Sequence, residues 1–490
     1  MITISRLLAR QFRAVARRAG LGKGGLLGSA CVRLMSTVDT LRLQSSNGRV
    51  AIEHRSTGKF TPTDMTVPLQ LLADCEAKAV SLVTIRTDDS GRIVASWDDR
   101  GVPQHRDYDV PKTAPEMPTG PNEWATNDHK LLAALRDAKA TAEESSTRYS
   151  LDCLQLKGST GTIASTDSHQ LLLQSGFQFP WQDEVLMRVT NVFGSSELSS
   201  NTPVEIGRSE PGVTVRIGEW TIFHEINKEG RFPNVDRTIP SQEAIVTRMR
   251  VDAADARFLA DTVNRLPADD QVDRPVTLEL NGEVVLRARK DAESPMTELV
   301  LSRSQRLGNQ LRLQTNRGFL ARSLSLGFTE IGFVDDKSPC VCRDETRTFV
   351  WMLLEPQDAL EPSDSAQRIE SWSVLGNTAT TERAKNTKAA CTAPSVAATI
   401  ASAVVSMNRM AEHLPQGAAT RPISKTYVGV GSLPSPSTDV IEQALALRDQ
   451  LRTVVQGLTE LVTQIRHQRK QTQLMKSTLQ SLKQLQLLNA

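Results

Sequence analysis

Apolar side chains along the chain recur first with the period of a helix and then with the period of a strand, and this order of segments returns three times. The helical segments are 6–18, 67–78, 129–141, 184–193, 253–265 and 317–326. Segments with the alternation of strands are 1–5, 31–34, 40–44, 49–54, 81–87, 92–97, 107–110, 150–156, 161–165, 170–174, 204–206, 213–217, 220–225, 244–251, 276–280, 284–289, 298–302, 310–315, 330–334, 339–343 and 348–354. The pattern predicts an α+β fold built from one unit used three times.

The three passages predict three tandem domains, each with two helices packed on antiparallel sheets. A stretch rich in Pro, Thr and Gly at 111–123 is typical of a linker. The segment 230–240 contains Phe232 and Pro233 and ends at Pro240. It is predicted to be a rigid connection between two folded units, because proline ends helices and has no backbone N–H to donate to a neighbouring strand. The expected domains are therefore 1–120, 121–240 and 241–356.

The last part of the chain has a different character. Residues 357–438 are dominated by Ser, Thr, Ala, Pro and charged residues, with few large apolar groups to offset the ordering entropy, so we expect a disordered linker. Residues 439–490 carry a heptad pattern that is regular from Leu447 to Ile465, which predicts a coiled coil or helical hairpin whose partner is unknown. Beyond Glu460 this helix has basic residues without acids, which either keep it soluble or contact nucleic acid.

Composition narrows the classes of function. The 490 residues carry a net charge of only +2, so a nucleic-acid partner has to be argued from the local distribution of charge. No apolar run approaches the ~18 residues of a membrane-spanning helix. The six cysteines form no CxxC pair, and Cys340 and Cys342 read as packing residues on one face of a strand. No nucleotide-binding or zinc-protease motif occurs, so we expect no catalytic residue, metal or cofactor.

The N-terminus has two interpretations. The first carboxylate of the chain is Asp39, and an acid-free, arginine-rich helix is typical of a mitochondrial presequence. The helix at 6–18, however, has counterparts at 129–141 and 253–265, which favour a structural element of the first repeat. Apolar side chains lie on one side of this helix and arginines on the other. The apolar residues are Leu8, Phe12, Val15 and Ala19, and the arginines are Arg6, Arg10, Arg13 and Arg17.

Motifs of the second and third passages resemble those of a known family. Residues 146–151, 161–171, 230–233 and Pro240 are similar to the middle domain of the bacterial β sliding clamp, the processivity subunit of DNA polymerase III. Residues 315–320, 335–339 and 349–352 are similar to the last domain of that family. The resemblance extends from about 125 to 356, whereas residues 1–120 match only in pattern. It implies three tandem DNA-clamp domains.

The resemblance also implies a function without catalysis. Two protomers would form a head-to-tail ring whose helices line a hole for duplex DNA, with DNA polymerase and clamp-loader subunits as partners and a bacterial cytoplasmic location. Sliding requires cations near phosphates without base readout. The expected DNA-binding residues are Arg6, Arg10, Arg13, Arg17, Lys130, Arg136, Lys139 and Arg317. Where the ring closes, Phe258 and Val263 are the expected apolar contacts.

The family also has an apolar pocket for partner peptides between its second and third domains. The resemblance places the wall of this pocket at Leu151, Thr166, His169, Leu171, Pro240, Val350, Met352, Leu353 and Leu354. Ser168 and Gln170 stand where the family usually has Gly and Arg, and the chain continues after Glu355, where the family usually ends. The alternative hypothesis is therefore a clamp-like scaffold that has lost DNA loading and acts through its tail.

Overall fold

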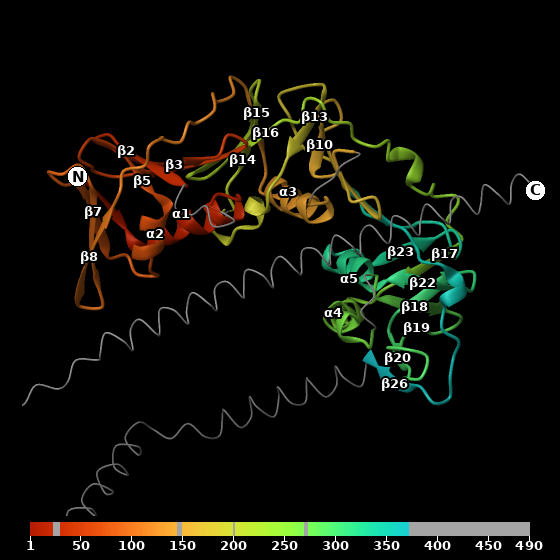
Figure 1. Ribbon diagram of the computed structural model, residues 1–490. Helices are drawn as coiled ribbons and strands as arrows, with labels where there is room; N and C mark the ends of the chain where they lie inside the picture. Colours follow the sequence, from red (N-terminus) through yellow and green to blue (C-terminus); the bar gives the residue numbers. More distant parts are fainter. Residues whose placement is uncertain (23–29, 145–148, 199–200, 269–272, 372–490) are drawn as a thin grey trace, which may run out of the picture. The chain divides into compact units, whose positions relative to one another are not determined.

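The computed structural model describes residues 1–371 except 23–29, 145–148, 199–200 and 269–272. The predicted coiled coil at 439–490 and the part of the predicted linker beyond Ser371 lie outside the described residues. Strands dominate the described part, and an order of one strand, one helix and three strands recurs along it (Figure 1). The predicted α+β class is therefore confirmed in its coarse form, as a mostly β fold with few helices.

Repeat 1 consists of two halves with this order of elements. The first half contains β1 (Ile2–Ser5), α1 (Arg6–Arg18), β2 (Cys31–Ser36), β3 (Thr40–Ser46) and β4 (Val50–Thr57). The second half contains β5 (Thr63–Pro68), α2 (Leu69–Cys75), β6 (Leu82–Thr87), β7 (Ile93–Asp99) and β8 (Val102–Tyr108). The helix predicted at 67–78 is thus shorter, because Val67 and Pro68 belong to β5, which pairs with β2.

Repeat 2 keeps the strands of this order but has a helix only in its first half. The first half contains β9 (Trp124–Asn127), α3 (Lys130–Thr141), β10 (Cys153–Lys157), β11 (Thr162–Thr166) and β12 (Gln170–Gln174). The second half contains β13 (Glu184–Arg188), the 3-10 turns η2 (Asn191–Gly194) and η3 (Ser196–Leu198), β14 (Val204–Arg208), β15 (Gly212–Ile217) and β16 (Trp220–Glu225). The short turn η4 (Asp236–Thr238) follows.

The helix predicted at 184–193 is wrong. Val185 and Met187 are buried at alternate positions, which is the period of a strand, and β13 pairs along its whole length with β10. The run is too short for its period to be assigned from the sequence, and the edge of β10 decides between the two structures.

Repeat 3 again has a helix in each half. The first half contains β17 (Thr247–Arg250), α4 (Ala253–Thr262), η5 (Val263–Arg265), β18 (Pro275–Leu280), β19 (Val284–Ala288) and β20 (Thr297–Val300). The second half contains β21 (Gln305–Gly308), β22 (Arg312–Asn316), α5 (Arg317–Ser325), β23 (Glu330–Phe333), β24 (Cys340–Arg343) and β25 (Arg347–Trp351). Beyond it lie η6 (Pro356–Asp358) and β26 (Gln367–Glu370), in a stretch where the composition predicts disorder.

Neighbouring repeats share sheets. The strands β5-β2-β3-β4 of repeat 1 continue into β16-β15-β14-β9 of repeat 2 through the antiparallel pair β4 and β16. The strands β13-β10-β11-β12 of repeat 2 continue into β25-β24-β23-β17-β21 of repeat 3 through the antiparallel pair β12 and β25. The remaining strands form two outer sheets, β1-β6-β7-β8 and β22-β18-β19-β20-β26.

The N-terminal helix is an integral part of repeat 1. α1 begins and ends where the sequence predicts, and Ser5 Oγ accepts a hydrogen bond of 3.0 Å from the Leu8 amide as its N-cap. Phe12 and Val15 are fully buried in a core that repeats 1 and 2 share. β1, which precedes the helix, pairs with β6.

Repeat 3 has a core of its own. It includes Cys340 and Cys342, which are fully buried, so the prediction that they are packing residues is confirmed. Val263 is also fully buried there, and Phe258 packs against this core. Val263 is therefore not exposed for the contact with a second protomer that the sequence predicts. Within the described residues, no helix combines the length and the apolar character needed to span a bilayer.

Candidate DNA interface and partner pocket

The arginines of α1 divide into buried and exposed side chains. Arg6 is only 7% exposed. Its Nε donates to the Cys75 carbonyl at 2.7 Å, its Nη1 to the Asp98 carbonyl at 2.8 Å, and its Nη2 to Asp99 Oδ1 at 3.1 Å. This guanidinium holds α1 to the second half of repeat 1, so the expectation that Arg6 faces DNA does not fit the structure.

Arg317 is also an interior residue, although it opens α5. It is 1% exposed, and its guanidinium donates to five backbone carbonyls that surround it. The acceptors are the carbonyls of Val263, Leu266, Pro267, Arg274 and Pro275. Arg317 therefore organises the loop after α4, and we leave it out of the DNA interface. The sequence gives no local sign of this role, because the five carbonyls lie more than forty positions away from Arg317.

A basic cavity lies where α1, α3 and η2 meet, and its volume is about 500 Å³. α1 contributes Arg17 and Arg18, which are exposed, and α3 contributes Arg136 and Lys139. The other lining residues are Ala140, Thr190, Asn191, Phe193 and Gly194. Among the described residues that line this cavity, none carries a carboxylate. We call these four cations the basic cluster.

The geometry around the basic cluster favours an anion. A Cβ at Gly194 would lie 3.3 Å from Arg18 Nη1, so the absence of a side chain leaves room for that guanidinium. Arg136 Nε donates to Asp137 Oδ1 at 2.9 Å, which neutralises part of its charge. Converging guanidinium and ammonium groups without lining carboxylates are what phosphate oxygens bind.

Arg322 of α5 fixes the end of α3 beside this cavity. Its Nη2 donates to the Asp137 carbonyl at 2.8 Å and to Thr141 Oγ1 at 2.6 Å, and its Nη1 donates to the Ala140 carbonyl at 3.1 Å. Burial lowers the pKa of Arg322 from its ordinary value. A cation at a helix C-terminus stabilises the last carbonyls, so this contact positions Lys139 and Ala140 on the cavity wall.

The sequence pattern did not predict Arg18 as part of this cavity, and it predicted DNA contacts for cations that lie elsewhere. Arg18 lies off the stripe of arginines that are spaced three or four residues apart, so the helical period does not single it out. Arg10 and Arg13 are half-buried, and Arg13 Nη1 forms an ion pair with Glu76. Lys130 is exposed but faces a different cavity, which Asp128, Asp137, Asp344 and Glu345 also line.

The nine residues predicted for the partner pocket differ in burial: five are buried, two are half-buried and two are exposed. Leu171 and Val350 lie opposite each other on β12 and β25 and are buried against Phe232 and Val235 of the 230–240 segment. Leu151 and Thr166 are buried as well. Thr166 Oγ1 donates to the Gln170 carbonyl at 2.7 Å, and Pro240 accepts from the Arg343 guanidinium.

His169 and Met352 form the exposed part of this set. The Met352 amide donates to the His169 carbonyl at 2.9 Å, and the Met352 side chain is 44% exposed. After Met352 the chain turns away, because Leu353 packs in the core of repeat 3 and the Leu354 amide donates to the Gln314 carbonyl at 2.9 Å. The nine predicted residues therefore do not form one continuous wall.

The two departures near this surface have structural consequences. Ser168 has φ +77°, in the left-handed region that glycine adopts without strain, so the turn has a backbone conformation that favours glycine. Asp167 Oδ1 accepts the His169 amide at 2.9 Å and the Gln170 amide at 2.8 Å. The Gln170 side chain donates to Asp167 Oδ2 at 2.8 Å and so does not extend over the surface.

No family model and no curated protein matches the sequence. Solved structures do match the fold. The DNA polymerase III subunit beta of Pseudomonas aeruginosa is 20% identical, with a TM-score of 0.58 over 72% of this chain and 100% of that one. The DNA polymerase III beta chain of Streptococcus pneumoniae is 17% identical, with a TM-score of 0.60 over 72% and 100%. The DNA polymerase sliding clamp of Bacillus subtilis is 16% identical, with a TM-score of 0.59 over 72% and 98%. The resemblance read from the sequence is therefore confirmed, and this chain has the fold of the bacterial DNA polymerase III beta subunits, the sliding clamps.

Proposed function

We propose that this protein is a non-catalytic sliding clamp that encircles duplex DNA as a head-to-tail dimer and gives processivity to a DNA polymerase. The observation that carries the proposal is the basic cluster, in which helices of two successive repeats present Arg17, Arg18, Arg136 and Lys139 together. Phosphate contacts from such side chains hold DNA without reading its sequence, which is the requirement for sliding. The fold shared with solved clamps supports the same function.

The proposed DNA interface extends from the basic cluster along the same two helices. It includes Arg10 and Arg13 of α1, and it excludes Arg6 and Arg317 because both are buried. We assign Lys130 of α3 only to its margin, because Lys130 lines a separate cavity together with carboxylates. Around the exposed pair His169 and Met352, we place the contact for peptides of the polymerase and clamp-loader subunits. A bacterial cytoplasmic location goes with this function.

Retention on closed DNA tests the encircling step. We would incubate the protein at micromolar concentration with a nicked circular plasmid, separate bound from free protein by gel filtration, and then linearise the plasmid with a restriction enzyme. A clamp elutes with the circular plasmid and dissociates after linearisation, because a ring slides off free ends. Equal retention on both forms would contradict encirclement.

One observation favours the alternative, a clamp-like scaffold that does not load onto DNA. β26 occupies the edge of β20, in a sheet that repeat 3 does not share with repeat 2. For a scaffold we expect no retention on either form of the plasmid. Any role of the tail in such a scaffold concerns residues outside the described part of the chain.

A further inference from the structure

β26 is an added strand on the last outer sheet. Residues Gln367–Glu370 pair with Thr297–Val300 of β20, and this pair is parallel, whereas the other strand pairs in the described part of the chain are antiparallel. The Gln367 amide donates to the Met296 carbonyl at 2.8 Å, one residue before β20 begins. Figure 1 shows β26 beside β20. We call residues 356–371, which carry β26, the strap.

Hydrogen bonds at two points anchor the strap. The Ser371 side chain is fully buried; its Oγ donates to Asp255 Oδ1 at 2.7 Å and accepts from the Ser302 amide at 3.0 Å. At the other end, the Leu360 amide donates to Thr277 Oγ1 at 2.8 Å. Between these points most strap residues are exposed, and Ile369 is the apolar side chain of β26 that packs against the core.

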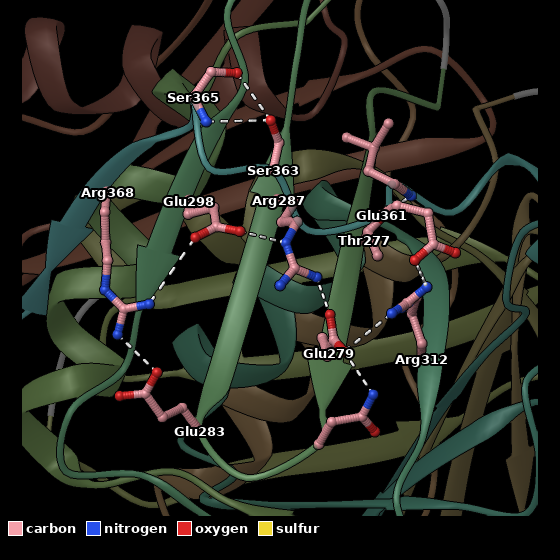
Figure 2. A network of polar contacts seen from close by, with 12 residues as sticks. Thr277, Glu279, Glu283, Arg287, Glu298, Arg312, Glu361, Ser363, Ser365 and Arg368 are labelled. Atoms are coloured by element: carbon pink, nitrogen blue, oxygen red, sulfur yellow. Dashed lines mark hydrogen bonds and ion pairs between the residues drawn. The ribbon is translucent and has the colours of Figure 1, made fainter.

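The strap also completes a network of charged side chains on the outer sheet (Figure 2). Arg368 Nη2 lies 2.7 Å from Glu283 Oε2, and Arg368 Nη1 lies 4.0 Å from Glu298. Glu298 also accepts from the buried Arg287 at 2.6 Å. Glu361 of the strap pairs with Arg312. Charge pairs that are partly exposed contribute little net stability and weaken with salt, so this contact is suited to release.

The strand pairs that join successive repeats follow one pattern. The last strand of the first half of repeat 1, β4, pairs with the last strand of the second half of repeat 2, β16. In the same way β12 of repeat 2 pairs with β25 of repeat 3. The next pair in this series joins β20, which ends the first half of repeat 3, to β8, which ends the second half of repeat 1. Within one chain these two strands belong to separate sheets, and β8 lies at the edge of its sheet.

We propose that the strap covers the edge of β20 at which two copies of the chain assemble. While β26 is paired with β20, the β8 strand of a second copy cannot pair there. Release of the strap exposes that edge. An uncovered strand edge presents unpaired amides and carbonyls and is a template for pairing with another chain. The inference rests on the proposed ring and adds its regulation.

Three full-length variants test the cover. Gln367→Pro/Arg368→Glu removes the amide that bonds Met296 and reverses the charge beside Glu283, which releases the strap. Thr297→Cys/Gln367→Cys joins directly opposed residues by a disulfide and locks the strap on β20 under oxidising conditions. Lys337→Glu, in the exposed turn between β23 and β24 and away from the strap, is the matched charge-reversal control.

Sedimentation velocity gives the dimer Kd of each variant. We expect the released variant to dimerise at least tenfold more tightly than the wild type, the locked variant to stay monomeric until it is reduced, and the control to match the wild type. Adding Gln104→Pro in β8 to the released variant should abolish its dimer. Dimers of equal Kd in all variants would overturn the cover and leave the clamp proposal intact. A released variant that remains monomeric at tens of micromolar would overturn ring closure itself, and with it both proposals.

Discussion

Arg317 Nη1 donates a hydrogen bond of 2.6 Å to the Leu266 carbonyl, and thereby ties the first turn of α5 to the loop that follows α4. We predict that Arg317→Met lowers the free energy of unfolding by on the order of 3 kcal/mol, because buried carbonyl acceptors lose their donors. Arg317→Lys should not rescue the loss, since one ammonium cannot reach all the acceptors of a guanidinium. Urea unfolding followed by circular dichroism measures both. Arg257→Ala, an exposed arginine on α4, is the control. A fully stable Arg317→Met with weakened DNA binding would instead place this side chain at the DNA.

The basic cluster should determine how DNA binding depends on salt. We predict that Arg17→Ala/Arg18→Ala reduces the slope of log K against log salt by roughly 0.9 for each phosphate that the variant no longer neutralises. Fluorescence anisotropy of a labelled duplex at several salt concentrations measures the slope. Arg49→Ala/Arg55→Ala removes the same charge from two exposed arginines of the β3–β4 hairpin, outside the cavity, and should leave the slope unchanged. If both double variants change it equally, binding reflects overall charge rather than this cavity.

The turn after β11 stores strain that can be released. Ser168 adopts φ +77°, and for a residue other than glycine such a conformation costs on the order of 1 kcal/mol. We therefore predict that Ser168→Gly raises the free energy of unfolding by up to about 1 kcal/mol, which the urea midpoint measures. Ser159→Gly, at an exposed serine with ordinary backbone angles, should be neutral or destabilising. A destabilised Ser168→Gly would mean that the side chain itself supports the turn.

His224 should make stability depend on pH. Its ring is fully buried against Phe193, with no hydrogen-bond partner for either nitrogen among the described residues. Burial lowers the pKa of His224 from 6.5 to about 3. Below pH 6.5 the unfolded state therefore binds a proton that the folded state does not, so stability falls as the pH falls towards 3, by up to about 1.4 kcal/mol per pH unit.

The variant His224→Leu should lose this part of the pH dependence. Thermal unfolding between pH 7 and pH 4 provides the comparison. His105→Gln, which changes an exposed histidine of β8, is the control and should retain the pH dependence of the wild type. A steep loss of stability that persists in His224→Leu would assign it to other groups, such as carboxylates in ion pairs.

Much of the local structure follows from the sequence alone. The bounds of α1, β12 and β16 agree with the predicted segments, because the apolar period of each is unbroken and its ends carry clear signals, such as Ser5 before α1. The threefold order of helices and strands, and through it the clamp resemblance, could also be read from the sequence, since the period of apolar residues is a local property.

Tertiary contacts decided the roles of individual side chains. Arg6 and Arg10 look equivalent on a helical period, yet only Arg6 is buried, because the carbonyls that receive it lie at positions 75 and 98. The segment 184–188 is a strand because β10 offers it an edge, and Gln367–Glu370 are ordered because β20 does. The local pattern of apolar and polar residues does not show which distant strand edge or carbonyl a residue will bond. The sequence therefore determined which elements form and in what order, and the tertiary structure decided which cations gather around the basic cluster and which edge the strap covers.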